Sequence, residues 1–211
     1  MNIKPYKVYL FDFDGTLFDT IKSSEYVFKE AYASIGVTIK DEDILGYTRE
    51  PIPDAYKRLN APEDKWDIFA DNIVKLVNSD KSCELTYIYD DTYNTVIDLK
   101  TDEAILGIVT SNNVKHVKDI LKKYNMEDIF FDVLVGNEEA PTPKPDPMPI
   151  LVALKMLNYK GDLKDVVYVG DALNDIKAAK AAHIESVLLD RDNHYPNSDE
   201  YIKIHSLSEL L

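Results

Sequence analysis

Cysteine is nearly absent from the chain. Cys83 is the one cysteine among 211 residues, which excludes an intrachain disulfide and a cluster of thiolate metal ligands. The four histidines are scattered without ligand spacing, and we expect surface or helix-packing roles for them (His116, His183, His194 and His205). A lone thiol fits a reducing compartment, so we expect the protein to be cytoplasmic.

Basic residues are few relative to acidic ones. The chain has 24 Lys and Arg against 38 Asp and Glu, which gives a formal net charge of −14. A nucleic-acid surface needs clustered basic side chains to neutralise phosphates, so we expect no nucleic-acid partner. The same imbalance repels a small anionic substrate unless a cation or a local basic pocket reverses the field.

Long apolar runs and biased segments are also missing. No stretch approaches the roughly 18 to 20 apolar residues of a membrane-spanning helix, and we expect no membrane partner. The N-terminal segment "MNIKPYKVYLFDF" has too short an apolar run for a signal peptide. Hydrophobic residues make up 45% and charged residues 29% of the chain, an ordinary globular composition that predicts one or two folded domains.

What the sequence does contain is a series of short apolar runs separated by helical patterns. Five short runs that are apolar on both faces, rather than alternating, predict strands at residues 7–12, 104–111, 131–136, 165–171 and 185–190. Such runs are typical of strands covered by helices on both faces. The alternation predicts an α/β fold with a three-layer, Rossmann-like core built on a parallel sheet.

One long region has helical patterns without strands. We predict an inserted all-α helical cap domain at residues 18–84, within an α/β core formed by residues 1–17 and 85–211. Because open α/β sheets bind ligands at the carboxyl ends of their strands, an insertion after the first strand would act as a lid over the site. The segment "TYIYDDTYNT" at residues 86–95 is predicted to be a hinge and solvated surface.

Three of the predicted strands end in polar side chains suited to catalysis or are followed by them, and one more such side chain lies in the Pro-rich loop "PKPDP". They are Asp12, Asp14, Thr110, Ser111, Asn112, Asp171 and Asp175, with Lys144 in the loop. Because the carboxyl ends of parallel strands lie along one edge of a sheet, these groups should converge. Taken alone, "DFDGT" is also compatible with a turn of solvated acids. A calcium-binding EF-hand loop is rejected, because it needs glycine at its sixth position and Gly15 is the fourth.

Together these segments resemble the four motifs of the haloacid dehalogenase superfamily, in the same order. "DFDGTL" matches motif I, "VTS" at residues 109–111 matches motif II, Lys144 in "KPDP" matches motif III, and "GDALND" at residues 170–175 matches motif IV. The helical insertion resembles the cap of the subfamily that contains phosphoglycolate phosphatases and β-phosphoglucomutases. The cap sequence is less diagnostic than the motifs, so the resemblance implies the fold and the chemistry but not the substrate.

The resemblance implies a nucleophile and a metal site. Asp12 would attack phosphorus and form an aspartyl-phosphate. Mg²⁺ would be held by Asp12, the backbone carbonyl of Asp14 and Asp171, and would offset the repulsion between a carboxylate and a phosphate. Asp175, one helical turn after Asp171, would reach the metal through a water or hold Lys144.

The resemblance also implies the groups that handle protons and the phosphate. Asp14 would be the general acid toward the leaving oxygen and then the general base toward water. Superfamily members that cleave carbon–halogen or phosphonate bonds lack an acid here, so Asp14 favours phosphate monoesters. Thr110 would hydrogen-bond a phosphoryl oxygen, with Ser111 and Asn112 beside it in the phosphate-binding segment, and Lys144 would stabilise the charge.

Substrate specificity is expected to come from the cap. Arg49 in "GYTREP" is the candidate for binding a second anionic group, because a guanidinium binds phosphate or carboxylate bidentately. A surface ion pair with Glu50 is the alternative. Asp19 is expected to cap the first cap helix beside Thr20 rather than to join the site.

The leading hypothesis is a Mg²⁺-dependent phosphatase whose partner is a small phosphorylated metabolite and which is a monomer or weak homodimer. Phosphoglycolate, sugar phosphates, nucleotides and pyrophosphate all stay open as substrates. A β-phosphoglucomutase-like phosphomutase would share the catalytic residues but return the phosphoryl group to a reoriented sugar. A catalytically quiet binding protein on the same fold would release no phosphate.

Overall fold

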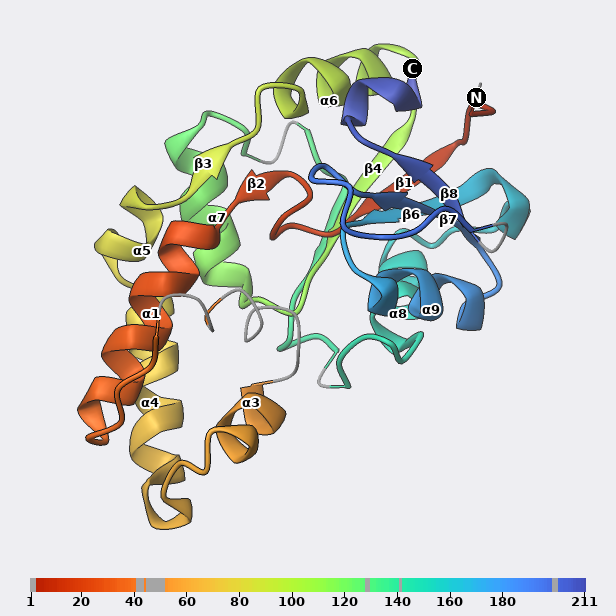
Figure 1. The fold of residues 1–211 in the computed structure, drawn as a ribbon. Coiled ribbons are helices and arrows are strands. Elements are labelled where there is room, and N and C mark those ends of the chain that lie inside the picture. Colours follow the sequence, from red (N-terminus) through yellow and green to blue (C-terminus); the bar gives the residue numbers. More distant parts are fainter. Residues whose placement is uncertain (1–2, 41–43, 45–51, 128–129, 141, 199–200) are drawn as a thin grey trace. The chain divides into compact units, whose positions relative to one another are not determined.

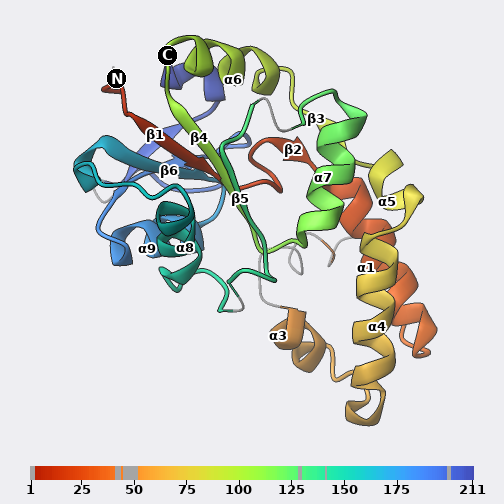
Figure 2. The same cartoon turned by 180° about the vertical axis from the view of Figure 1, so that it is seen from behind.

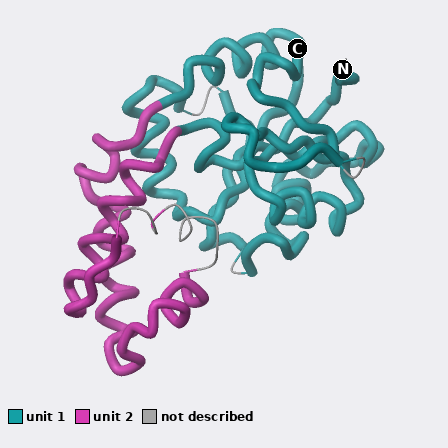
Figure 3. The backbone as a smooth tube through the Cα atoms, viewed as in Figure 1, with its two compact units in different colours: residues 1–18, 88–211 teal, residues 19–87 magenta. Residues whose placement is uncertain are grey.

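The chain divides into two compact units. The computed structural model describes residues 3–40, 44, 52–127, 130–140, 142–198 and 201–211. Unit 1 comprises Met1–Phe18 and Ile88–Leu211, and unit 2 comprises Asp19–Tyr87 (Figure 3). Each unit has a hydrophobic core of its own. The role of unit 2 as a cap stays a prediction.

Unit 1 is built on a six-stranded parallel sheet with the strand order β5-β4-β1-β6-β7-β8 (Figure 1). Its strands are β1 (Val8–Phe11), β4 (Ile105–Val109), β5 (Val133–Val135), β6 (Val166–Gly170), β7 (Glu185–Leu189) and β8 (Ile202–Ile204). Every residue of the two central strands, β1 and β6, is buried. Burial on both faces explains why these segments are apolar throughout.

Helices cover both faces of this sheet (Figures 1 and 2). They are α6 (Thr92–Thr101), α7 (Val114–Lys123), α8 (Met148–Met156) and α9 (Leu173–Ala181), with the short 3-10 helices η2 (Leu163–Asp165) and η3 (Leu207–Leu210). α8 and α9 pack on one face through a cluster that includes Ile150 and Ala178. The connections through α6 and α7 run along the sheet in the opposite direction, so right-handed crossovers place these two helices on the other face. The predicted three-layer α/β architecture is confirmed.

Three short strands were not predicted from the sequence. β8 carries Lys203 between two isoleucines and follows a segment rich in Asn, Pro and Asp, so it lacks the continuous apolar pattern of the other strands. β2 (Phe18–Asp19) and β3 (Tyr87–Ile88) pair with each other where the chain leaves unit 1 and returns to it. With two residues each, they are too short for a periodicity to show.

The segment at residues 86–95, predicted to be a hinge and solvated surface, has exposed residues such as Tyr87 and Asp90, but part of it is regular and buried. Its role as a hinge stays a prediction. The segment contains β3 and the first turn of α6, and Thr92 and Thr95 are buried. The hydroxyl of Thr92 donates a 2.8 Å hydrogen bond to the carbonyl of Leu17, so this polar side chain is buried with a partner.

Unit 2 is helical. Its elements are α1 (Ile21–Ser34), α3 (Ile52–Arg58), η1 (Glu63–Lys65), α4 (Trp66–Val77) and α5 (Asp80–Glu84). The apolar stripes of α1 and α4 form much of its core, which includes Tyr32 and Phe69. At the start of α1, the Asp19 carboxylate accepts a 3.0 Å hydrogen bond from the N–H of Ile21. Within the described ranges, no helix is both long and apolar enough to cross a membrane.

Candidate active site

Three of the acidic residues that were predicted for the site lie together at the carboxyl edge of the central strands. Asp12 directly follows β1 and Asp171 directly follows β6, and the two strands are neighbours in the sheet. The N–H of Asp12 continues the ladder with a 2.9 Å hydrogen bond to the carbonyl of Val169. With Asp175 of α9, these residues offer carboxylate oxygens that all lie within 4.8 Å of one another.

Lys144 reaches this cluster from the loop before α8, where the Lys144–Pro145 peptide bond is cis. Its side chain is 7% exposed, and its Nζ lies 3.0 Å from Oδ1 of Asp12 and 2.7 Å from Oδ1 of Asp175. The third neighbour is the hydroxyl of Tyr168, at 2.9 Å. An ammonium group has three N–H donors, so each of them has an acceptor here.

Asp12 has one oxygen held in place. Its Oδ1 accepts a 2.8 Å hydrogen bond from the N–H of Phe13 in addition to the contact with Lys144. Among the described residues, no hydrogen bond is donated to Oδ2. A carboxylate fixed through one oxygen presents the other in a defined direction, which is what a nucleophile requires.

The site contains more negative charge than Lys144 offsets. Burial raises the pKa of Asp12 well above its usual range; Lys144 opposes this effect and Asp175 adds to it. Burial, together with Asp175, raises the pKa of Asp171 to about 7. Burial acts to lower the pKa of Lys144, but Asp12 and Asp175 outweigh it and hold that pKa well above its usual range. A cation bound here would favour the charged form of the carboxylates.

Asp175 has a partner for each oxygen. While Oδ1 contacts Lys144, Oδ2 accepts a 3.0 Å hydrogen bond from the N–H of Ala172 at the start of α9. The side chain is buried, with 2% exposed. Of the two roles expected for Asp175, the geometry therefore contains the contact with Lys144, and ligation of a metal stays a prediction.

Gly15 leaves room for the carboxylate of Asp171. It follows Asp14 in the turn after β1 and has a φ of 73°. A Cβ at this position would collide with Oδ2 of Asp171. This left-handed conformation lets the chain turn here and favours glycine, and the close approach to Asp171 gives a second reason for it.

The residues of motif II line the same edge beyond β4. Thr110 is buried, and its Oγ1 accepts a 3.1 Å hydrogen bond from the N–H of Asn112. Nδ2 of Asn112 lies 3.4 Å from Oδ2 of Asp14, so the amide orients the predicted acid–base residue. Ser111 is exposed. Arg49 lies outside the described residues, so its role stays a prediction.

Tyr168 is a site residue that sequence reasoning missed. It lies within β6, where an aromatic residue is indistinguishable from core, yet its hydroxyl contacts Lys144. The signal available in the sequence was a hydroxyl in a strand that is otherwise apolar, "VVYVG". Because a buried hydroxyl needs a partner, this tyrosine pointed to a polar neighbour.

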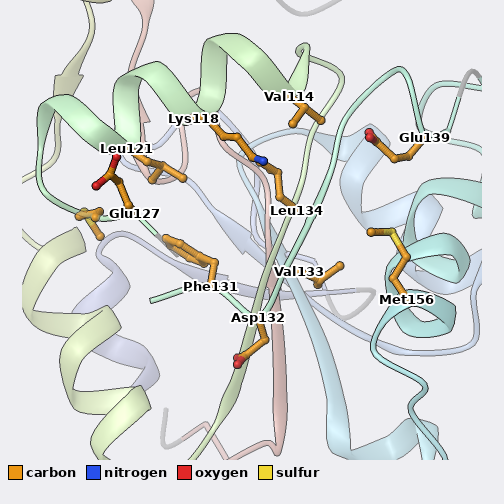
Figure 4. A pocket seen from close by; sticks show the side chains of 11 residues that line it. Val114, Lys118, Leu121, Glu127, Phe131, Asp132, Val133, Leu134, Glu139 and Met156 are labelled. Atoms are coloured by element: carbon orange, nitrogen blue, oxygen red, sulfur yellow. The ribbon is translucent and has the colours of Figure 1, made fainter. Parts of the chain in front are cut away.

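A pocket of about 460 Å³ lies apart from these residues. Its lining comes from α7, residues between α7 and β5, the edge strand β5 and the end of α8, as the side chains of Lys118, Phe131 and Met156 show (Figure 4). Asp12, Lys144 and the other residues predicted for catalysis do not line it. The chemistry is therefore assigned to the strand ends and not to this pocket.

Comparison with known proteins agrees with the motifs and the fold. A family model described as haloacid dehalogenase-like hydrolase matches residues 9–189. The chain belongs to this family. The expected superfamily and the expectation of a hydrolytic enzyme are thereby confirmed.

Two curated relatives of this hydrolase are named as phosphatases. The pyrophosphatase PpaX of Bacillus velezensis is 33% identical over 175 residues, which cover 82% of this chain and 78% of the relative. The phosphoglycolate phosphatase of Colwellia psychrerythraea is 26% identical over 209 residues, which cover 92% and 89%. A Bacteroides fragilis structure described as haloacid dehalogenase-like matches with a TM-score of 0.85 at 26% identity, over 98% of this chain and 100% of that one.

Proposed function

We propose that this hydrolase is a Mg²⁺-dependent phosphatase that acts on a small phosphomonoester through an aspartyl-phosphate. The observation that carries the proposal is the geometry of Asp12. One oxygen is fixed by Lys144 and the N–H of Phe13, while the other has no partner among the described residues. The carboxylates of Asp171 and Asp175 complete a compact ionic site around it.

The reaction has two steps. In the first, Oδ2 of Asp12 forms a bond to phosphorus as the bond from phosphorus to the leaving oxygen breaks, and Asp14 donates a proton to that oxygen. In the second, Asp14 takes a proton from water as the water oxygen attacks phosphorus, which releases inorganic phosphate and regenerates Asp12. Lys144 offsets negative charge on the nucleophile and the phosphoryl group during both steps.

The residues present fit a divalent cation. Asp12 and Asp171 provide carboxylate oxygens and Asp14 provides a backbone carbonyl, which is the all-oxygen donor set that Mg²⁺ prefers. The missing Cβ of Gly15 allows the Asp171 carboxylate to lie against the turn. When bound, Mg²⁺ neutralises the repulsion between the nucleophile and the phosphate dianion.

Thr110 and its neighbours are assigned to the phosphoryl oxygens. The Thr110 hydroxyl accepts a hydrogen bond from the N–H of Asn112, and its own O–H can still donate to a phosphoryl oxygen. Ser111, which is exposed, and Asn112, which contacts Asp14, lie beside it in the chain. These groups would bind phosphate before and during the transfer.

Unit 2 is assigned the role of a helical cap that selects the substrate. It is inserted directly after the turn that carries Asp14. The relatives named pyrophosphatase and phosphoglycolate phosphatase make pyrophosphate and phosphoglycolate the first substrates to test. Arg49 is the candidate for binding a second anionic group, so Arg49→Ala should lose the preference among anionic substrates while retaining activity on an aryl phosphate. An unchanged preference would contradict that role.

A phosphate-release assay with Mg²⁺ over a panel of metabolite phosphates tests the proposed function. We expect turnover of at least one small substrate, and a loss of roughly three orders of magnitude or more in Asp12→Asn. Absence of turnover on the whole panel would contradict the proposal and favour a binding protein. With β-glucose 1-phosphate and a bisphosphate primer, formation of glucose 6-phosphate in place of inorganic phosphate would instead favour a phosphomutase.

A further inference from the structure

The hydroxyl of Tyr168 makes two hydrogen bonds inside the core of unit 1. Tyr168 is fully buried on β6. Its Oη accepts a 2.9 Å hydrogen bond from Nζ of Lys144 and donates a 2.6 Å hydrogen bond to the carbonyl of Val109. The phenol hydroxyl therefore both donates and accepts a hydrogen bond.

These two bonds connect parts of the site that are distant in the sequence. Val109 is the last residue of β4, and Thr110 follows it. The loop of Lys144 lies between β5 and α8. The hydroxyl of Tyr168 thus joins the lysine to the strand end that carries the predicted phosphate-binding residues.

Tyr168 is also the uncharged member of the three acceptors around Nζ. The other two, Asp12 and Asp175, pull the ammonium group toward the carboxylates. With the third N–H donated to a group anchored on β6, the position of Nζ is fixed in three directions. Without that acceptor, a buried N–H of a charged group would lack a partner, and the lysine would shift to find one.

We propose that Tyr168 is a positioning residue of the phosphoryl-transfer site, whose hydroxyl holds Lys144 against Asp12 and ties it to the end of β4. The inference rests on the proposed function. It also explains why an apolar strand carries a phenol where phenylalanine would fill the same space, since a hydroxyl removed from water is costly unless it is hydrogen-bonded. The sequence motifs do not include this residue.

The test is the variant Tyr168→Phe, with Tyr9→Phe as a matched control. Tyr9 is a buried tyrosine of the neighbouring strand β1, and its hydroxyl accepts a 3.0 Å hydrogen bond from the N–H of Tyr6, away from Lys144. Both variants lose one buried phenol hydroxyl that is bonded to the backbone. Only Tyr168→Phe also removes a contact with Lys144.

Two readouts separate positioning from packing. In steady-state kinetics we expect kcat of Tyr168→Phe to fall by about tenfold to a hundredfold, because a small displacement of a charged group in the site lowers the rate of the chemical step. KM should change little. Tyr9→Phe should show no such loss of kcat. The second readout is nitrogen-resolved NMR of the lysine ammonium groups. The signal of Lys144 is assigned by its loss in Lys144→Ala. This signal should be visible in the parent protein, should shift or broaden in Tyr168→Phe, and should stay unchanged in Tyr9→Phe. Thermal melting of both variants monitors folding.

Either readout can overturn the inference. A kcat of Tyr168→Phe equal to that of Tyr9→Phe would contradict it, and so would an unchanged Lys144 ammonium signal. If the parent protein turned over none of the substrates, the proposed function would fail. The NMR comparison would still decide whether Tyr168 holds Lys144, because it does not depend on activity.

Discussion

Two features of the structure require glycine at position 15: its backbone conformation and its contact with the site. Its φ is 73°, and a Cβ would collide with the carboxylate of Asp171. We expect Gly15→Ala to lower phosphatase turnover by roughly tenfold or more, because the Asp171 carboxylate must shift from its present position in the site. Strain at a positive φ should also lower the free energy of unfolding by about 1 kcal/mol. Turnover per folded molecule and urea unfolding measure the two effects.

Gly36 offers the control for that prediction. Its φ is 79°, and a Cβ there would meet nothing within 4 Å. Gly36→Ala should therefore show a similar loss of stability without the loss of turnover. Equal turnover in both variants would mean that the Cβ at position 15 does not disturb the site.

At the scale of residues, the side chains at the strand ends could be predicted from the sequence, but the contacts that hold them in place could not. Asp12 and Asp171 are conspicuous because a carboxylate directly follows an apolar run, and parallel strands bring such ends together. Tyr168 sits inside a run, so its contact with Lys144 depends on the packing of a loop against β6 that no local pattern encodes. The contact between Asn112 and Asp14 likewise depends on the turn geometry at two strand ends.

At the scale of elements, five of the six strands of the sheet were predictable because they are mostly buried and their apolar runs are nearly continuous. The edge strand β8 was not, since it includes Lys203, whose Nζ donates hydrogen bonds to Asn193 and to the carbonyl of Tyr195. The start of α6 was missed because Asp91 and Thr92 read as solvated residues. Both are engaged by partners from distant parts of the chain.

The network around Asp91 joins α6 to η3 and to the segment after β7. Arg191 donates two hydrogen bonds of 2.9 Å to the Asp91 carboxylate, and it also donates one of 3.0 Å to the carbonyl of Thr16. The Ser206 hydroxyl and the N–H of Leu207 donate to Asp91 as well, at 2.7 and 2.8 Å. Burial alone would raise the pKa of Asp91, but the hydrogen bonds from Arg191 and Ser206 outweigh it and lower that pKa.

This network predicts how stability depends on pH. Because the pKa of Asp91 is lower in the folded state, its contribution is complete above its ordinary pKa of 3.8 and is lost as the pH falls through the folded value. At neutral pH we expect Asp91→Asn to lower the free energy of unfolding by about 2 kcal/mol. The difference from the parent should shrink in acid. Urea unfolding over a pH series measures it.

Asp165→Asn is the matched control at this scale. Asp165 pairs with Lys7 at 2.6 Å, but the lysine side chain is 75% exposed. Solvent weakens such a pair, so the variant should change stability little at any pH. If both variants behaved alike, the network around Asp91 would have no special role.

At the scale of the whole molecule, the net charge of −14 acts on every equilibrium in which a cation takes part. A simple salt such as NaCl screens the self-repulsion of this charge and can itself raise stability. A metal site is therefore shown only by an effect of the cation beyond that of ionic strength. We expect MgCl₂ to raise the thermal midpoint more than NaCl of equal ionic strength, because a ligand that binds the folded state stabilises it, by about 2.7 kcal/mol at a hundredfold excess over Kd. Each kcal/mol corresponds to a shift of the thermal midpoint of roughly 2–4 °C.

The control variant is Asp171→Asn. In it the additional rise of the thermal midpoint with MgCl₂ should disappear while the rise with NaCl remains, because the loss of one carboxylate barely alters the total charge. Equal increments from the two salts in the parent protein would contradict a magnesium site at this edge of the sheet.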